Sequence, residues 1–387
     1  MREPAIELAD IFRLYGPVYR RTHSVPLHQL KLMRAIETCR TPALGGVVEW
    51  CERCQFAHTQ YRSCRNRHCP KCQGAARQKW LAQRRAELLP AVFFHVVFTL
   101  PEQLAAIAFY NKKPLYDLLF RITAETLLSI AGDPRRLGVE LGFFAVLHSW
   151  GQNLHFHPHL HCVVPGGGLD GGGARRWIHA RRQYLLPVKV LSAYFRRRLL
   201  EELEKLYAAG GLQFFSDLEP LGNPAAFQRY LAPLRQARWV VYAKPPFGGA
   251  PQVLQYLGRY THRVAISNRR LQKLEDGQVS FEWKDYREKA PSQQIKTMTV
   301  AAEEFIRRFL QHSLPTGLQR IRYYGWLANC HRAAMLELCR QWLATPSSAL
   351  RPQFPAAPAK PEPRQCPLCG RILVRMVIQP CRALDSS

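Results

Sequence analysis

Histidines at alternate positions are the first feature of this sequence that could do chemistry. The stretch HFHPHLHCVV contains His155, His157, His159 and His161. In an extended strand, side chains two residues apart lie on the same side, about 6.5 Å apart along the strand. His159 and His161 would then present two imidazoles together, and neutral imidazole is a common metal ligand. The spacing predicts half of a metal site; the alternative is a strand with a polar, half-solvated face.

A tyrosine pair in the segment QYLGRYTHRVAIS is the second such feature. On a helix, Tyr256 and Tyr260 would share one face, because residues four apart have Cβ atoms about 5–6 Å from each other. Packing is the ordinary use of such a pair. A phenol can also attack a phosphodiester and hold a DNA end as a phosphotyrosine ester. That attack needs a divalent cation, such as Mg2+ or Mn2+, to polarise the phosphate, and the paired histidines would hold it.

Cysteine spacing predicts structural zinc near the N-terminus. The motifs CERC and CPKC are separated by 14 residues, close to the spacing of a four-thiolate zinc site. We expect this Zn2+ to be held by Cys51, Cys54, Cys69 and Cys72. A second zinc site could use neighbouring residues, each of which could equally be packed or solvent-facing: Cys39, His58, Cys64 and His68.

The charge of the chain indicates a polyanionic partner. Lys and Arg number 55 against 28 Asp and Glu, for a formal net charge of +27. Such an excess favours nucleic acid first and an anionic membrane second. No apolar run approaches the ~18 residues of a spanning helix, and MREPAIELAD does not resemble a secretory signal. We therefore expect a cytoplasmic, nucleoid-associated protein, in which 12 cysteines favour metal ligation over disulfides.

Three basic segments are candidates for contact with DNA. They are RNRHCPKCQ, the tyrosine segment, and GLQRIRYYGWLAN at 317–329. In the last, aromatic rings could stack on bases while arginines follow the backbone, which suits single strands. An amphipathic core segment is the ordinary alternative. The candidate DNA-binding residues are Arg65, Arg67, Lys71, Arg259, Arg263, Arg320 and Arg322.

The elements that must position these residues mix strands and helices without a regular βαβ repeat. We predict strands at 93–101, 141–150 and 159–165, the last beginning after Pro158, a glycine-rich loop at 166–173, and helices at 189–209, 251–264 and 301–312. This pattern predicts an α+β fold with helices packed on a sheet. Three consecutive parts are expected: a zinc-binding, DNA-contacting domain at 1–90, a catalytic domain at 91–345, and a Pro/Ala-rich linker with a short CxxC tail at 346–387.

Taken together, the segments resemble the bacterial rolling-circle insertion-sequence transposases of the HUH endonuclease superfamily, in the group with paired tyrosines. The resembling stretches follow the family order and cover most of residues 10–330: CRTPALGG, SCRNRHCPKCQ, HVVFTLP, HPHLHCVVPGGGL, YLGRYTHRVAIS and RIRYYGWLAN. The resemblance implies an HUH-type antiparallel sheet flanked by helices, with the histidines on a central strand and the tyrosines on a helix. A small zinc-binding domain would precede it. The tail motif CPLCG, with Cys381, resembles half of a zinc ribbon.

The same resemblance implies roles for the paired residues. His159 and His161 would bind the divalent catalytic metal, and Tyr256 and Tyr260 would be the nucleophiles; Gln152 and His157 are candidates for the third metal ligand. The expected activity is nicking and joining of single-stranded DNA, at mobile-element ends and target DNA, through a 5′-phosphotyrosine intermediate. A rolling-circle replication initiator or relaxase would use the same chemistry. From a different class, a non-catalytic zinc-finger regulator would need only the cysteines and the positive charge.

Overall fold

The computed structural model describes residues 6–85, 87–171, 176–181, 183–244, 258, 264–288, 290–343 and 364–380. The chain forms two compact units. The first comprises residues 1–80, 262–313 and 351–387, and the second comprises 81–261 and 314–350. This division differs from the three consecutive parts expected from the sequence, because residues 262–313 and the C-terminal tail pack with the N-terminal residues.

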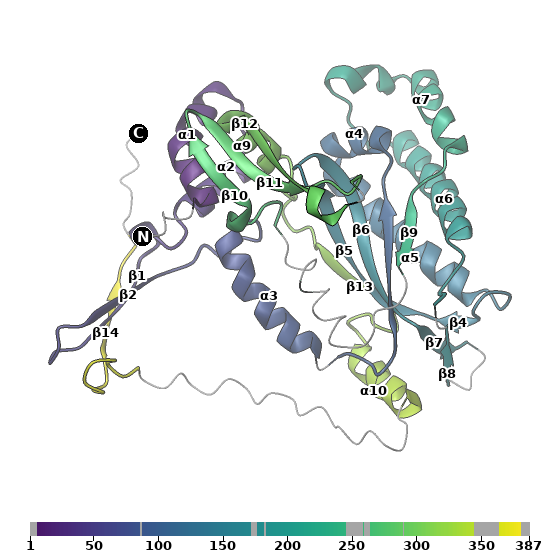
Figure 1. Cartoon of the computed structure of the whole chain (residues 1–387). Helices are drawn as coiled ribbons and strands as arrows, with labels where there is room; N and C mark the ends of the chain where they lie inside the picture. Colours follow the sequence, from purple (N-terminus) through teal and green to yellow (C-terminus); the bar gives the residue numbers. More distant parts are fainter. Residues whose placement is uncertain are drawn as a thin grey trace. The chain divides into compact units, whose positions relative to one another are not determined.

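A five-stranded antiparallel sheet forms the centre of the second unit (Figure 1). Its strands, in spatial order, are β13 (Ile321–Gly325), β5 (Gly142–Trp150), β6 (Phe156–Pro165), β3 (Phe93–Thr99) and β9 (Val241–Lys244). The predicted strands at 93–101, 141–150 and 159–165 are therefore confirmed as β3, β5 and β6. The central position belongs to β6, so the strand that carries the histidines has a neighbour on each side.

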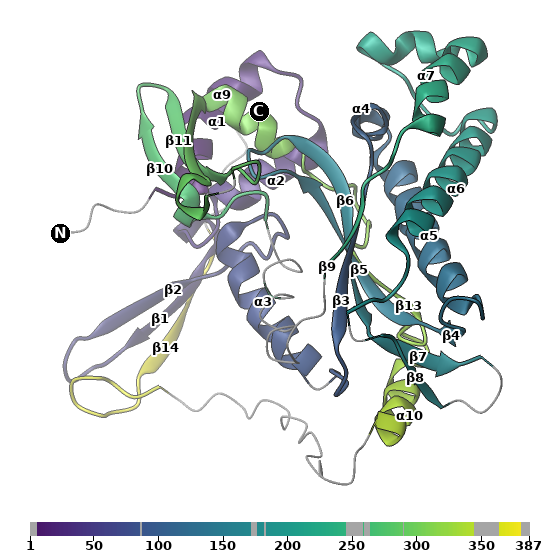
Figure 2. The same ribbon diagram turned by 45° about the vertical axis from the view of Figure 1, so that its right-hand side comes forward.

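One face of this sheet packs on helices. Figures 1 and 2 show α5 and α6 along that face. Because side chains alternate along a strand, Phe94 and Phe98 of β3 and Leu160 and Val164 of β6 all enter one hydrophobic core. The helices of this unit are α4 (Glu102–Tyr110), α5 (Lys112–Gly132), α6 (Val188–Ala208), α7 (Pro224–Gln236) and α10 (Arg332–Leu343). Odd-numbered residues of β6, the histidines among them, face the other way.

Two details of the second unit correct the sequence-based expectations. The strand β6 begins at Phe156, ahead of Pro158, because the pairing register with β5 shifts between His148 and Trp150 and such an irregularity tolerates proline. The glycine-rich run is not a loop throughout. It contains β7 (Gly167–Asp170), which lies between β4 (Val139–Glu140) and β8 (Trp177–His179) in a small sheet. A Cβ on Gly168 would lie 2.4 Å from the carbonyl oxygen of Glu140, so glycine permits this close approach.

Helices and a three-stranded sheet make up one part of the first unit. They are α1 (Leu8–Thr22), α2 (Leu27–Glu37), α9 (Ala302–Leu310), β10 (Leu271–Glu275), β11 (Gln278–Lys284) and β12 (Ile295–Ala301). The predicted helices at 189–209 and 301–312 are thus confirmed, as α6 of the second unit and α9 of the first. The rings of Phe12 and Phe309 meet edge to face at 5.5 Å, both within the buried faces of their helices. This packing explains why residues 262–313 belong with the N-terminal helices.

The other part of the first unit is a second three-stranded sheet. Its order is β14 (Val374–Ile378), β1 (Gly46–Trp50) and β2 (Ala57–Tyr61), and α3 (Pro70–Arg85) follows β2 in the chain. Short 3-10 helices occur at Pro42–Leu44, Ser216–Gly222, Asn268–Arg270 and Pro291–Gln293. None of the described helices combines the length and the hydrophobicity that a membrane span requires.

Candidate functional site

Three histidines from two adjacent strands meet on the face of the five-stranded sheet that points away from its core. The Nε2 atoms of His159 and His161, both on β6, lie 3.1 Å apart. His148 on β5 is directly opposite His159 in the strand register. One ring nitrogen from each histidine lies within 4.8 Å of the other two. This set, the histidine triad, can therefore supply three nitrogen ligands to one metal ion.

The backbone fixes the tautomer of His159. Its Nδ1 lies 2.7 Å from the carbonyl oxygen of His157. A carbonyl oxygen only accepts hydrogen bonds, so Nδ1 carries the proton and Nε2 keeps its lone pair. That lone pair is on the nitrogen that faces His161, which is the arrangement a metal ligand needs.

A further histidine lies behind His161. The Nε2 of His95, on β3, is 2.7 Å from the Nδ1 of His161, and both side chains are buried. Burial lowers the pKa of His95 to about 3, and the positive charge of Lys244 acts in the same direction, so its ring is neutral. His161 can then donate from Nδ1 to His95 and keep Nε2 for a metal. His95 is therefore a positioning residue for His161.

The triad contains a residue that the sequence analysis missed. His148, and not the candidate His157, completes the set of three within the described part of the chain. The other candidate, Gln152, lies in the turn between β5 and β6 and stays a prediction. The signal for His148 was present in the predicted strand at 141–150, where it alternates with core residues such as Leu147.

The proposed nucleophiles cannot be placed in the same way. Tyr256 and Tyr260 lie outside the described residues, together with Arg259 and Arg263 and most of the helix predicted at 251–264. Their roles stay predictions that rest on the sequence.

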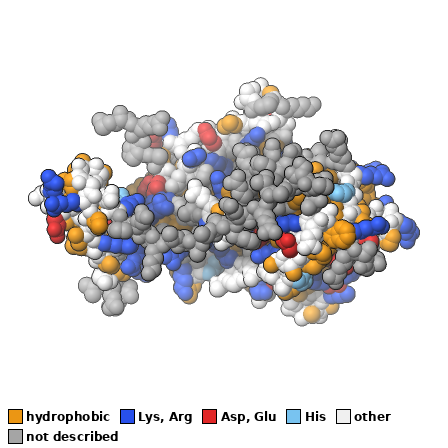
Figure 3. All heavy atoms as spheres, turned by 90° about the horizontal axis from the view of Figure 1, so that it is seen from below, with side chains coloured by type: hydrophobic (Ala, Val, Ile, Leu, Met, Phe, Trp, Pro, Cys, Tyr) orange, Lys and Arg blue, Asp and Glu red, His pale blue; other side chains and the backbone are white. Residues whose placement is uncertain are grey.

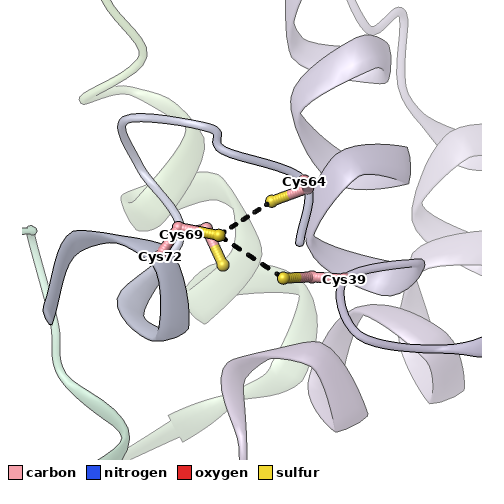
Figure 4. Close-up of side chains that lie close together, drawn as sticks. All are labelled: Cys39, Cys64, Cys69 and Cys72. Carbon is pink, nitrogen blue, oxygen red and sulfur yellow. Dashed lines mark hydrogen bonds between the residues drawn. The ribbon is translucent and has the colours of Figure 1, made fainter. Parts of the chain in front are cut away.

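Four cysteines of the first unit form the first cysteine cluster (Figure 4): Cys39, Cys64, Cys69 and Cys72. The Sγ atom of Cys72 lies 3.5 Å from those of both Cys39 and Cys64. Zinc–sulfur bonds of about 2.3 Å in a tetrahedron place the sulfurs about 3.8 Å apart, so the cluster has the size of a four-thiolate zinc site. A hydrogen bond with Cys64 is the main cause that lowers the pKa of Cys69 below the ordinary value of a thiol.

The predicted pairing of the two CxxC motifs in one site is wrong. CPKC joins Cys39 and Cys64, whereas CERC joins Cys366 and Cys369 of the tail. The reason is the hairpin formed by β1 and β2. CERC forms its turn, whereas the first cluster lies beyond its base, five residues or about 17 Å away along the strands. Neither His58 nor His68 belongs to a cluster in the described part of the chain.

Several residues of the aromatic segment at 317–329 take part in packing. The ring of Tyr324 stacks on Phe143 with centroids 5.2 Å apart, and Trp326 is buried and donates to the carbonyl of Glu140. Arg320 is buried as well. The guanidinium of Arg322 forms an ion pair with Asp117 and lies 4.2 Å from the ring centroid of Phe120. Burial and ion pairing thus engage these two arginines within the protein, and their contact with DNA stays a prediction.

The three basic residues beside the first cysteine cluster differ in how open they are to a phosphate. Arg65 is exposed, with a left-handed backbone conformation. Burial lowers the pKa of Arg67, and Lys71 forms an ion pair of 2.6 Å with Glu7. Figure 3 shows Lys and Arg side chains at many places on the surface that it draws, with fewer Asp and Glu side chains. Of the three predicted contacts here, Arg65 has the side chain most open to a partner.

Comparisons with known proteins show the family of the chain. Residues 142–334 match the family described as "Putative transposase", and residues 11–100 match "Transposase zinc-binding domain". The chain is 58% identical over 368 residues to "Putative transposase y4qJ" of Sinorhizobium fredii, and the alignment covers 95% of this chain and 91% of that protein. It is 28% identical over 354 residues to the transposase for insertion sequence element IS801 of Pseudomonas savastanoi pv. phaseolicola, with coverages of 87% and 80%. No solved structure matches the chain.

Proposed function

Because the chain belongs to the IS91 family of insertion-sequence transposases, with an N-terminal zinc-binding domain, we propose that it nicks and joins single-stranded DNA during rolling-circle transposition. The proposal rests above all on the histidine triad on a central strand of an antiparallel sheet. Three imidazoles leave coordination positions open for a substrate oxygen, as catalytic metal sites do, whereas four cysteines close a structural site. We propose that this sheet is of the HUH type.

The donor set fits a divalent cation held by His148, His159 and His161. When bound, the cation would polarise the scissile phosphate and offset negative charge as the phenol attacks. Three nitrogen ligands fit Mn2+ better than Mg2+, because Mg2+ prefers oxygen ligands. The chain's own contribution is to orient the ligands. The carbonyl of His157 leaves Nε2 of His159 available to the cation, and the ring of His95 does the same for Nε2 of His161.

In the proposed reaction, the phenol of Tyr256 or Tyr260 gives up its proton as its oxygen attacks the phosphorus. The bond from phosphorus to the 3′ oxygen breaks, that oxygen takes up a proton and leaves as a hydroxyl, and the 5′ phosphate stays on the tyrosine. The second tyrosine cuts the far end of the element. A 3′ hydroxyl then attacks the phosphotyrosine ester, which restores a phosphodiester and frees the phenol.

The test is a strand-cleavage assay on single-stranded oligonucleotides from both ends of the host element, with Mn2+ and with Mg2+. We expect a covalent protein–DNA adduct with the wild type and none with the double change Tyr256→Phe/Tyr260→Phe, since phenylalanine keeps the ring and removes the nucleophilic oxygen. An adduct from the double variant at the wild-type rate would place the nucleophile elsewhere. A wild type that binds DNA but gives no adduct with either cation would favour a non-catalytic regulator.

The two single changes separate the roles of the tyrosines. On one helix the two phenols differ in distance to a single cation by up to one turn, about 5.4 Å. We therefore expect Tyr256→Phe and Tyr260→Phe to differ in a single nicking assay and each to block complete transposition. If only one change matters, the other tyrosine is a packing residue.

A further inference from the structure

A second cysteine cluster brings together the N-terminal and the C-terminal segments of the first unit. It consists of Cys51 and Cys54 from the turn after β1 and Cys366 and Cys369 from the C-terminal tail. The Sγ atoms of Cys51 and Cys369, 318 residues apart in the chain, lie 3.5 Å from each other. All four sulfurs lie within 4.8 Å of one another, and Cys51 and Cys366 are buried.

The two turns that carry these cysteines have the same backbone hydrogen bonds. In the first, the N–H of Cys51 donates to the carbonyl of Phe56, and the N–H of Gln55 donates to Cys51. In the tail, the N–H of Cys366 donates to Arg371, and the N–H of Gly370 donates to Cys366. The fifth residue of each turn has a positive φ, 55° at Gln55 and 73° at Gly370. Two matching turns thus present two thiols each toward one point.

We propose that Cys51, Cys54, Cys366 and Cys369 hold a second structural Zn2+, which fastens the C-terminal tail to the N-terminal hairpin. Four thiolates in a closed set are the ligands that structural zinc takes in proteins. The zinc-binding family match ends at residue 100, so it does not include the tail cysteines. Leu373 and Phe56 pack in one hydrophobic cluster with the four cysteines.

Side-chain packing alone stabilises the tail strand β14 on the sheet only weakly. The strand β14 pairs with β1 from Gly46↔Ile378 to Trp50↔Val374, as Figure 1 shows. Yet Val374, Met376 and Val377 keep 47%, 51% and 58% of their surface exposed. An edge strand with so little burial is marginal in water. Zinc binding supplies folding free energy directly, so the metal would be the main force that holds β14 in place.

The first test counts metal on the full chain purified under reducing conditions. Elemental analysis should give two zinc ions per chain, and X-ray absorption should show sulfur ligands only. Cys366→Ser/Cys369→Ser should retain one zinc, and Cys64→Ser should lose the other. Cys330→Ser is the matched control, because Cys330 is exposed and in neither cluster, and it should retain two.

Three results would overturn the proposal. One is a single zinc per chain in the wild type, unaffected by the tail substitutions. Another is a second zinc with nitrogen ligands, which would place it on the histidine triad. The third is a disulfide between cysteines of the second cluster, seen by mass mapping of alkylated peptides.

The second test follows the tail itself by hydrogen exchange. In Cys366→Ser/Cys369→Ser, the β14 amides should lose protection, whereas β11 and β12, in the other sheet of the first unit, should keep theirs. The comparison of the two sheets shows whether the variant is still folded. Full protection of β14 in a variant that has lost one zinc would mean that the strand holds without the metal, which would overturn the fastening role.

Discussion

The histidine triad and the cysteine clusters are both groups of side chains that could hold a metal ion, but they are built in different ways. The triad comes from neighbouring strands of one sheet, with His148 and His159 paired in register. Its ligands are nitrogens, oriented from behind by His95 and a backbone carbonyl. Each cysteine cluster gathers four sulfurs from segments that are separate in the chain, and the second cluster spans 318 residues.

The difference fits the roles that we propose for the two kinds of site. An open nitrogen set on a rigid sheet can bind a cation and still admit a phosphate oxygen, while the groups behind the rings hold them in place. A closed sulfur set has no position for substrate and contributes folding free energy instead. We therefore expect changes in the histidine triad to affect chemistry and changes in the cysteines to affect stability.

His159→Ala and His161→Ala should cause the most severe loss. Each removes a proposed metal ligand, so nicking should fall by more than about 100-fold. DNA affinity should change little, because it comes from basic side chains. Nicking rate and DNA binding, measured on the same preparations, check this. His155→Ala is the control, since His155 is exposed on the same run; equal losses of binding and nicking would mean that the β6 histidines are structural.

The opposite pattern is expected from Cys69→Ser in the first cysteine cluster. It should remove zinc and lower the melting temperature of the first unit, since structural zinc is part of the folding free energy. The Mn2+ concentration for half-maximal nicking should stay near the wild-type value. A well-folded Cys69→Ser protein that melts like the wild type would contradict a structural zinc at this cluster.

A smaller effect is expected from His148→Ala. Loss of one of three ligands should reduce nicking by roughly 10- to 100-fold at fixed Mn2+, and a higher Mn2+ concentration should restore part of it. Gln152→Ala is the matched test of the other candidate ligand. If Gln152→Ala causes the larger loss, the glutamine and not His148 completes the site.

His95→Phe should have a weaker effect again. An aromatic ring remains in the packing, but the acceptor behind His161 is lost, so the Mn2+ concentration for half-maximal nicking should rise by about 10-fold. The rate at saturating Mn2+ should fall less. A reduced saturating rate with unchanged Mn2+ dependence would show that His95 acts in some way other than positioning a ligand.

The smallest effect is expected from Arg65→Ala, which we compare with Arg322→Ala. Arg65→Ala should reduce the slope of log affinity against log salt concentration by about 1, because an exposed phosphate contact is lost. Arg322→Ala should leave that slope unchanged and lower stability instead, since its guanidinium pairs with Asp117 and covers Phe120. Salt titrations of DNA binding check both.

The two kinds of site also differ in how far the sequence predicts them. The period of two around His159 is a local signal, so the strand and the paired ligands followed from it. His148 was missed because the register between β5 and β6 is decided by sheet packing and not by spacing within either strand. The cysteine pairing failed for a related reason. The partners of CERC come from the tail, and no local spacing connects Cys54 with Cys366.

Peptide mapping of the trapped protein–DNA adduct by mass spectrometry would decide whether the chain is a metal-dependent tyrosine transesterase. The wild type, incubated with Mn2+ and a single-stranded element end, should carry a 5′-phosphonucleotide on Tyr256 or Tyr260, and His161→Ala should carry none. Attachment at any other residue, or an adduct that forms equally well in His161→Ala, would contradict a tyrosine transesterase that depends on the histidine triad.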